Sequence, residues 1–191
     1  LNPLDANENE FYRKFSELSD YNDLFLILPN GAIFYTVAQG ADYRTNILNG
    51  NFKNSNLAKL VRKIGYGSLD IEQMNKRTRF VDFAPYEPKG NAPAAFIAKG
   101  VKISNSLLGK TSQTSRTNLG SQLVVALQLS DSTLNEVMLQ RTGLGETGES
   151  YLVGPDFKLR TSTRDPNRNL AASLRGALSL NGADTDPAPL A

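Results

Sequence analysis

The sequence predicts an α+β fold in which helices flank a five-stranded antiparallel sheet. Two pairs of apolar, β-branched and aromatic segments each surround a short cluster of turn-forming residues, which is the usual pattern of a β-hairpin. A segment with helical spacing lies between the two hairpins, and a fifth apolar segment follows the second one. Because most strands follow one another through turns and do not alternate with helices, we expect an antiparallel sheet and not a doubly wound one.

The first predicted element is a helix over residues 9–21. Its apolar side chains Phe11, Phe15 and Leu18 recur with the spacing of one helical face, and charged residues occupy the opposite face. Such a face packs either on the sheet or on a partner chain, and the sequence leaves both arrangements open.

The first hairpin follows this helix. Residues 23–28 form a nearly continuous apolar run of strand length, which is expected to be buried on both faces. Asn30 and Gly31 supply the positive φ angles of a tight turn, and residues 32–38 return as the partner strand.

A second helix is predicted after a polar loop over residues 40–54. Ser55 is a typical N-cap residue, and Gly65 ends the helical pattern. The apolar side chains between them recur at helical spacing: Leu57, Leu60, Val61 and Ile64. Residues 66–79 fit either a further short helix or a loop.

The second hairpin spans residues 80–104 and turns at residues 87–91. Strand alternation assigns one face to Phe80, Asp82, Ala84 and Tyr86 of the first strand, and one face to Ala94, Phe96 and Ala98 of the second. Small alanines beside large aromatic rings leave a hollow on the sheet surface. Either a helix or a small ligand fills this hollow.

The rest of the chain adds one strand to the sheet and then a separate segment. Residues 105–121 are rich in Ser and Thr and are expected to form a loop, and residues 122–129 form the fifth strand. A helix capped by Ser130, a hairpin over residues 145–164 and a helix over residues 169–180 complete the prediction.

Composition excludes several classes of function. Lys and Arg outnumber Asp and Glu by 21 to 19, so we expect no nucleic-acid partner. The chain has no cysteine and no histidine, which removes thiolate and imidazole metal ligands, cysteine nucleophiles and the Ser-His-Asp triad.

Residues 143–148 match the GxGxxG pattern of dinucleotide-binding sites. In such a site a strand precedes the glycines and a helix follows them, but here a helix precedes them and a strand follows. We therefore expect a binding protein with no cofactor and no metal.

The ends of the chain indicate a piece of a longer protein. No apolar run of about 18 residues is present, so no membrane-spanning helix is predicted. The first ten residues are polar and acidic, unlike a secretion signal, and both ends are abrupt.

Two charged side chains are candidates for ligand contacts. Asp82 lies among aromatic residues, where it either receives a ligand's ammonium group or bonds to the backbone. Arg44, in the loop after the second strand, either clamps a ligand carboxylate or is simply solvated.

In this order the segments of the chain resemble the Cache family, the PAS-like extracytoplasmic ligand-binding domains of bacterial chemoreceptors, sensor histidine kinases and nucleotide cyclases. The resemblance covers residues 21–164 and is carried by YNDLFLILPNGAIFYTV (21–37), ADYRTNIL (41–48), FVDFAPYEPKGNAPAAFIAKGV (80–101) and GLGETGESYLVGPDFKLRTSTR (143–164). The Tyr-Arg-Trp signature of the amino-acid-binding members is absent, and the chain has no tryptophan.

The resemblance implies a two-module variant of that family. Residues 1–142 would form a membrane-distal PAS-like module with an N-terminal helix, and residues 143–191 would begin a smaller membrane-proximal PAS-like module. The implied ligand pocket lies between the sheet and the loops after its second strand. By position, the implied ligand-binding residues are Tyr35, Asp42, Arg44, Asp82, Tyr86 and Phe96.

The expected function is therefore signal sensing in the periplasmic or extracellular part of an inner-membrane receptor, a sensor histidine kinase or a chemotaxis receptor. The domain would bind a small molecule, perform no chemistry, form a homodimer through the N-terminal helix, and connect to the membrane through helices outside this chain. The alternative is a PAS-like structural or protein-interaction module whose own side chains fill the hollow. An enzyme based on carboxylates alone is a third possibility.

Overall fold

The computed structural model describes residues 6–28, 30–64, 78–102, 122–140, 143–165 and 167–174. The chain divides into two compact units, Leu1–Leu129 and Ser130–Ala191. The predicted boundary between the modules, at residues 142 and 143, stays a prediction. The compact units differ from it in one respect, because the helix that begins at Asp131 belongs to the second unit.

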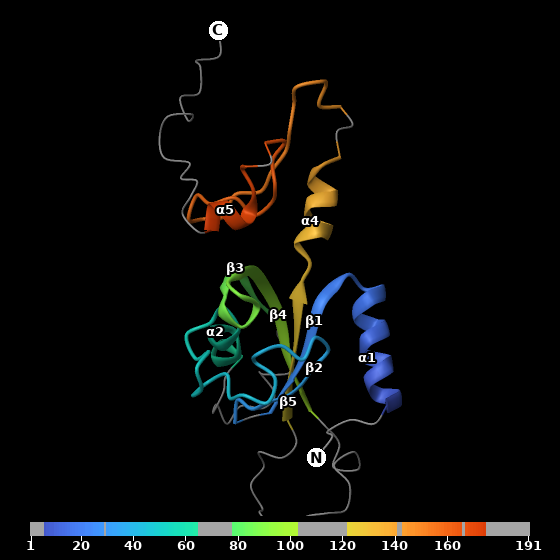
Figure 1. Ribbon diagram of the computed structural model, residues 1–191, viewed down its shortest axis with the longest axis vertical. Helices are drawn as coiled ribbons and strands as arrows, with labels where there is room; N and C mark the ends of the chain where they lie inside the picture. Colours follow the sequence, from blue (N-terminus) through green and yellow to red (C-terminus); the bar gives the residue numbers. More distant parts are fainter. Residues whose placement is uncertain are drawn as a thin grey trace, which may run out of the picture. The chain divides into compact units, whose positions relative to one another are not determined.

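The first unit is built on a five-stranded antiparallel sheet with the strand order β2-β1-β5-β4-β3 (Figure 1). Its elements are α1 (Ala6–Leu18), β1 (Tyr21–Ile27), β2 (Ile33–Thr36), α2 (Asn56–Lys63), β3 (Arg79–Tyr86), the 3-10 turn η1 (Glu87–Lys89), β4 (Ala92–Lys102) and β5 (Gln122–Leu129). Figure 1 shows α1 and α2 on opposite sides of the sheet. The predicted fold class is confirmed for this unit, which is an α+β five-stranded antiparallel sheet flanked by helices.

The larger part of the core lies between the sheet and α2. Ser55 caps α2 by accepting a hydrogen bond from the backbone N–H of Ala58, as predicted. The apolar face of α2 is fully buried and comprises Leu57, Ala58, Leu60 and Val61. These side chains pack with apolar residues of β1, β4 and β5, among them Phe25, Phe96 and Ala126.

The turn of the first hairpin forms as predicted. Gly31 has a φ angle of +84°, and a Cβ atom there would lie 2.7 Å from Cγ of Leu48. Glycine is therefore required at this position both for its backbone conformation and for the close approach of the following loop. The strand that precedes the turn is buried on both faces from Asp23 to Ile27, as predicted, whereas Leu28, the last residue of the predicted run, is exposed.

The rotation of α1 decides between the two arrangements that its pattern left open. Phe11, Phe15 and Leu18 are 63%, 39% and 86% exposed, so most of the apolar stripe faces away from the sheet, and the ring of Phe15 stacks on that of Tyr21 in β1. Tyr12 and Ser16 face the sheet instead, and Ser16 Oγ donates a hydrogen bond to the carbonyl oxygen of Tyr21. The two-residue connection to β1 and this hydrogen bond fix the rotation of the helix.

A β-bulge in β3 corrects the predicted face of that strand. Val81 pairs with Phe96 and Ala84 with Ala94, so three residue steps on β3 span two on β4. The bulge reverses the alternation, and Phe80 is 52% exposed while Tyr86 is fully buried. The prediction that Phe80 and Tyr86 share a face is therefore wrong, whereas Ala94, Phe96 and Ala98 do share a buried face.

The second unit contains α4 (Asp131–Met138) and α5 (Leu170–Leu174). Its predicted hairpin is reduced to one isolated bridge between Val153 and Leu159, closed by a turn. Ser173 Oγ accepts a hydrogen bond from the backbone N–H of Leu159, which links the turn region to α5. In the described part of the chain, no helix is long and apolar enough to cross a membrane. Residues 66–77, 103–121 and 175–191 lie outside the described residues, and so do the predictions for them, including the second half of the helix predicted over 169–180.

Candidate ligand-binding site

Five polar side chains gather on the α2-covered face of the sheet, next to the apolar core. We define this polar cluster as Asp23, Asp42, Tyr86, Lys89 and Gln128. Asp23 is two residues before the core residue Phe25 on β1, and Gln128 is two residues after the core residue Ala126 on β5. Because side chains alternate along a strand, Asp23 and Gln128 extend the same face of the sheet.

Asp42 and Tyr86 form a buried hydrogen bond across the cluster. The Tyr86 hydroxyl donates to Asp42 Oδ2 over 2.6 Å, and the two residues are 0% and 1% exposed. Tyr86 is the last residue of β3, and Asp42 lies in the turn after β2. Burial, and then the Asp42 carboxylate, raise the pKa of the Tyr86 phenol, so this hydroxyl acts as a donor and not as a base.

Phe96 forms the aromatic wall beside this pair. Its ring is 5.0 Å from the ring of Tyr86 and 5.8 Å from the ring of Phe25, both in edge-to-face arrangements. The structure therefore brings together three of the residues that the resemblance implied, namely Asp42, Tyr86 and Phe96.

Asp23 is a polar residue of the cluster that sequence reasoning missed. Its Oδ1 atom accepts hydrogen bonds from the backbone N–H groups of Leu24 and Ala38, at 2.8 and 3.1 Å. Its Oδ2 atom is buried, and Lys89 Nζ lies 3.8 Å away, beyond hydrogen-bond distance. Burial raises the pKa of Asp23, against the opposing effects of its backbone donors and Lys89. A carboxylate inside a strand predicted to be buried on both faces was the available signal.

Tyr35 does not belong to this cluster. It lies on the α1 side of the sheet, where its ring is 5.4 Å from that of Tyr12 and packs with Leu24 and Leu26. Together with residues of α1 it lines an open surface groove, whose lining is Asn9, Glu10, Arg13, Tyr35, Val37 and Gln39. Burial raises the pKa of the Tyr35 phenol.

Asp82 and Arg44 lie outside the cluster as well. Asp82 is in the β3 bulge, half-buried, and its Oδ1 atom accepts a hydrogen bond from the backbone N–H of Phe83. Its carbonyl oxygen accepts from Asn56 Nδ2, which ties the start of α2 to the hairpin. Arg44 is exposed, and its guanidinium lies 5.0 Å from the centre of the Tyr43 ring.

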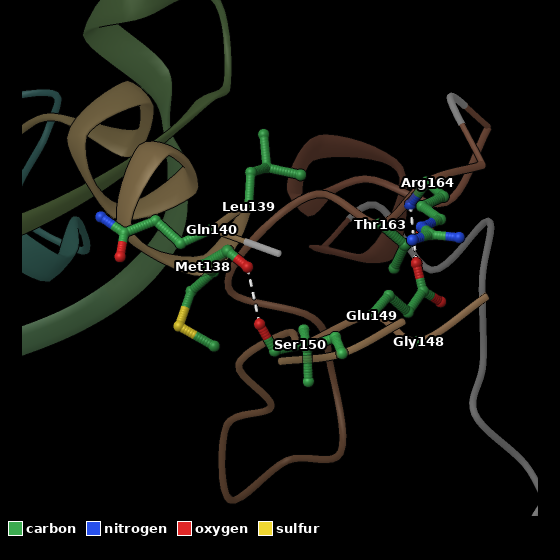
Figure 2. Close-up of a pocket in the computed structure, with 9 residues that line it drawn as sticks. Met138, Leu139, Gln140, Gly148, Glu149, Ser150, Thr163 and Arg164 are labelled. Atoms are coloured by element: carbon green, nitrogen blue, oxygen red, sulfur yellow. Dashed lines mark hydrogen bonds between the residues drawn. The ribbon is translucent and has the colours of Figure 1, made fainter. Parts of the chain in front are cut away.

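A second, much smaller hollow lies in the second unit (Figure 2). Ser150 Oγ donates to the carbonyl oxygen of Met138, and Glu149 Oε2 accepts from the backbone N–H of Arg164. The hollow encloses about 10 Å³, which is at the lower limit for one water molecule. It therefore offers no room for an organic ligand.

Among the described residues, no group of three or more acidic side chains is placed to hold a metal ion. The cluster offers carboxylate and amide oxygens, one ammonium group and one phenol, all beside aromatic rings. These groups can donate and accept hydrogen bonds, and every residue of the cluster except Lys89 is buried.

Comparisons with known proteins give limited similarity. No family model matches the sequence, and no curated protein matches it. Among solved structures, the chain is similar to the sensor domain of the histidine kinase DctB of V. cholerae, with 11% sequence identity and a TM-score of 0.40. The match covers 70% of this chain and 40% of that chain, so this chain corresponds to less than half of the DctB sensor domain.

Proposed function

We propose that this chain is the extracytoplasmic sensor part of a bacterial transmembrane receptor and that its first unit binds a small molecule at the polar cluster. The observation that carries the proposal is the burial of Asp23 and Asp42, each 1% exposed, beside the apolar core. Burying carboxylates costs free energy unless they are paired, and apolar side chains would fill a purely structural core at lower cost. Asp42 is paired with Tyr86, whereas Asp23 Oδ2 has no hydrogen-bond partner among the described residues and could accept a donor from a ligand.

The cluster also joins elements through which a signal could pass. Asp42 belongs to the loop after β2, Lys89 to η1, and Asp23 to β1. A ligand that contacts all three favours one arrangement of these elements over another. We propose that this bias reaches a kinase or chemoreceptor output domain through the second unit and through membrane helices outside this chain.

The proposed role is binding without catalysis. The chain has no histidine or cysteine, and the phenol of Tyr86 keeps its proton because of its raised pKa. Lys89 is the one amine of the cluster, and it lies 3.8 Å from Asp23 as the partner of a charge pair.

A second candidate function is protein interaction. Phe11, Phe15 and Leu18 form an exposed apolar stripe along α1. Such a stripe suits association of two copies of this chain through an isologous helix contact. The two functions are compatible, because α1 and the polar cluster lie on opposite faces of the sheet.

Thermal unfolding of the full chain against a panel of organic acids, amines, amino acids and nucleobases tests the ligand proposal. A compound at a hundred times its dissociation constant stabilises by about 2.7 kcal/mol, which raises the unfolding temperature by roughly 5 to 10 °C for a chain of this length. The rise should be lost in Asp42→Asn and kept in Asp20→Asn, which makes the same chemical change at an exposed site. A panel without any stabilising compound would contradict the proposal and favour the interaction module.

A further inference from the structure

Two buried oxygen atoms on the α2-covered face of the sheet are left without hydrogen bonds. Within the part of the chain that the structure describes, neither Asp23 Oδ2 nor Gln128 Oε1 has a hydrogen-bond partner. The two residues are 1% and 3% exposed. Buried polar atoms are almost always satisfied in folded proteins, so a pair of unsatisfied ones needs a specific explanation.

The two oxygens belong to neighbouring residues of the sheet. Asp23 of β1 and Gln128 of β5 are cross-strand partners in the antiparallel register. Opposite residues of an antiparallel pair present their side chains on the same face, about 5 Å apart at Cβ. A hydroxyl group on one of these side chains can therefore reach the oxygen of the other.

A proton on Asp23 satisfies both atoms at once. An ionised carboxylate and an amide oxygen are both acceptors, so the two atoms need a donor between them. A protonated carboxyl group carries one O–H, and protonation of Asp23 Oδ2 turns this atom into that donor. The proton comes from water, and its uptake also removes a charge that is costly to bury.

The groups that face Asp23 act on its pKa in opposite directions. Burial has the largest effect and raises the pKa, and the negative charge of Asp42, in the loop after β2, raises it as well. Lys89 of η1 and two backbone N–H groups lower it, but the pKa remains raised. Tyr35 of β2 and Tyr86 of β3 are also close, and both stay neutral because their own pKa values are raised.

Lys89 offers a second partner to the same oxygen when the proton leaves. Its Nζ atom lies 3.8 Å from Asp23 Oδ2, beyond hydrogen-bond distance, and its side chain is 26% exposed. The stem of a lysine is flexible, so a small rotation brings the ammonium group into contact with a charged Oδ2. The charged carboxylate is thus drawn to η1, and the protonated one to β5.

The two partners of Asp23 lie in different parts of the unit. Gln128 is the next-to-last residue of β5 and is followed closely by Ser130, the N-cap of α4, at which the second unit begins. Lys89 is the last residue of η1, the turn between β3 and β4. A change of partner therefore alters how β1 is tied to the strand that leads into the second unit.

We propose that Asp23 and Gln128 share one proton and that this pair makes the first unit responsive to acidity. In acid, Asp23 Oδ2 carries the proton and donates it in a hydrogen bond to Gln128 Oε1. At higher pH the proton returns to water, and Oδ2 accepts a hydrogen bond from Lys89 instead. This inference goes beyond the proposed ligand binding, because the proton itself is the stimulus and no cavity is needed.

Carbon-13 NMR of the full chain during an acid titration tests the proposal. The carboxyl carbon of Asp23 and the side-chain carbonyl carbon of Gln128 should change with one shared midpoint above pH 3.8, the ordinary pKa of an aspartate. The exposed amide of Gln140 is the internal control and should not follow that midpoint.

Three outcomes of this titration overturn the proposal. A midpoint at or below pH 3.8 would mean that Lys89 or the amide N–H of Gln128 donates to a charged carboxylate. A Gln128 carbon that does not follow Asp23 would show that they share no proton. Unfolding in acid before Asp23 takes up its proton would contradict the assignment too, because the proposed hydrogen bond belongs to the folded chain.

Two variants separate the two states of the pair. Asp23→Asn places an N–H donor in the position of the protonated oxygen, so the Gln128 carbon should no longer change around that midpoint. Lys89→Met removes the partner of the charged form, so the midpoint of Asp23 should move to higher pH. Lys99→Met, at an exposed position of β4, is the matched control and should leave the midpoint unchanged. An unmoved midpoint in Lys89→Met overturns the role of Lys89, and continued titration of the Gln128 carbon in Asp23→Asn overturns its link to Asp23.

Discussion

Tyr86 and Asp42 connect the end of β3 to the loop after β2 through one buried hydrogen bond. Tyr86→Phe removes the donor and leaves a buried carboxylate oxygen without it. A hydrogen bond to a charged group contributes about 1.5–3 kcal/mol, so the free energy of unfolding should fall by about that amount in denaturant titrations. Tyr21→Phe is the control, because Tyr21 is half-buried and stacks on Phe15 through its ring. An equal loss in both variants would contradict the role assigned to the Tyr86 hydroxyl.

Asp23 makes the stability of the protein depend on pH in a defined direction. Burial raises its pKa in the folded state above the ordinary value of 3.8. The protonated form is thus favoured by folding, and its contribution is present below pH 3.8 and is lost as pH rises through the raised value. In Asp23→Asn this loss cannot occur. The free energy of unfolding of Asp23→Asn minus that of the unmodified chain should therefore increase as pH rises from 3.8 towards neutrality, as measured by denaturant titrations. A difference that falls with pH would show that Lys89 stabilises the charged form more than burial opposes it.

At the scale of elements, α2 is held by its N-cap and by its buried face. Ser55→Ala removes the acceptor for the Ala58 N–H and should cost about 1 kcal/mol of stability. Ser19→Ala, at an exposed position after α1, is the control and should change the stability by less than about 0.5 kcal/mol. Urea titrations of both variants measure the difference. Equal stability of the two variants would mean that tertiary packing alone holds the start of α2.

The exposed stripe of α1 leads to a prediction about association. If two copies pair through Phe11, Phe15 and Leu18, then Leu18→Glu places a charge in the contact and should shift the protein to monomer in sedimentation measurements across a concentration series. Arg13→Glu also adds negative charge to α1, but on the side away from the stripe, where Arg13 pairs with Glu17, and it should leave the association unchanged. A monomeric unmodified chain at all concentrations would contradict the pairing.

Sequence patterns predicted where helices and strands lie in the chain better than they predicted which side chains of these elements are buried. Ser55, Gly31 and the apolar run of β1 act locally, so their roles could be predicted correctly from the residues alone. The bulge between Val81 and Ala84 and the rotation of α1 depend on pairing and on a side-chain bond to Tyr21, which hydrophobic spacing does not encode. As a result Phe80 does not share a face with Tyr86, and the apolar stripe of α1 is largely exposed.

At the scale of the whole chain, the candidate site was predicted in part. The resemblance to Cache sensors pointed to Asp42, Tyr86 and Phe96, which lie together, and also to residues that lie elsewhere. The pairing of Asp23 with Gln128 could not be predicted, because it depends on the register of two strands that are far apart in the sequence. Likewise, nothing in the residues near Lys89 indicates that it approaches Asp23.

The central claim is that a ligand binds at the polar cluster, on the α2-covered face of the sheet. Hydrogen exchange of backbone amides, compared with and without the most stabilising compound of the panel, tests it most directly. We predict slower exchange in residues 38–46 and 86–92, which carry Asp42, Tyr86 and Lys89, and no change in α1. Slower exchange confined to α1 and the groove beside Tyr35 would place the ligand on the opposite face and contradict the account.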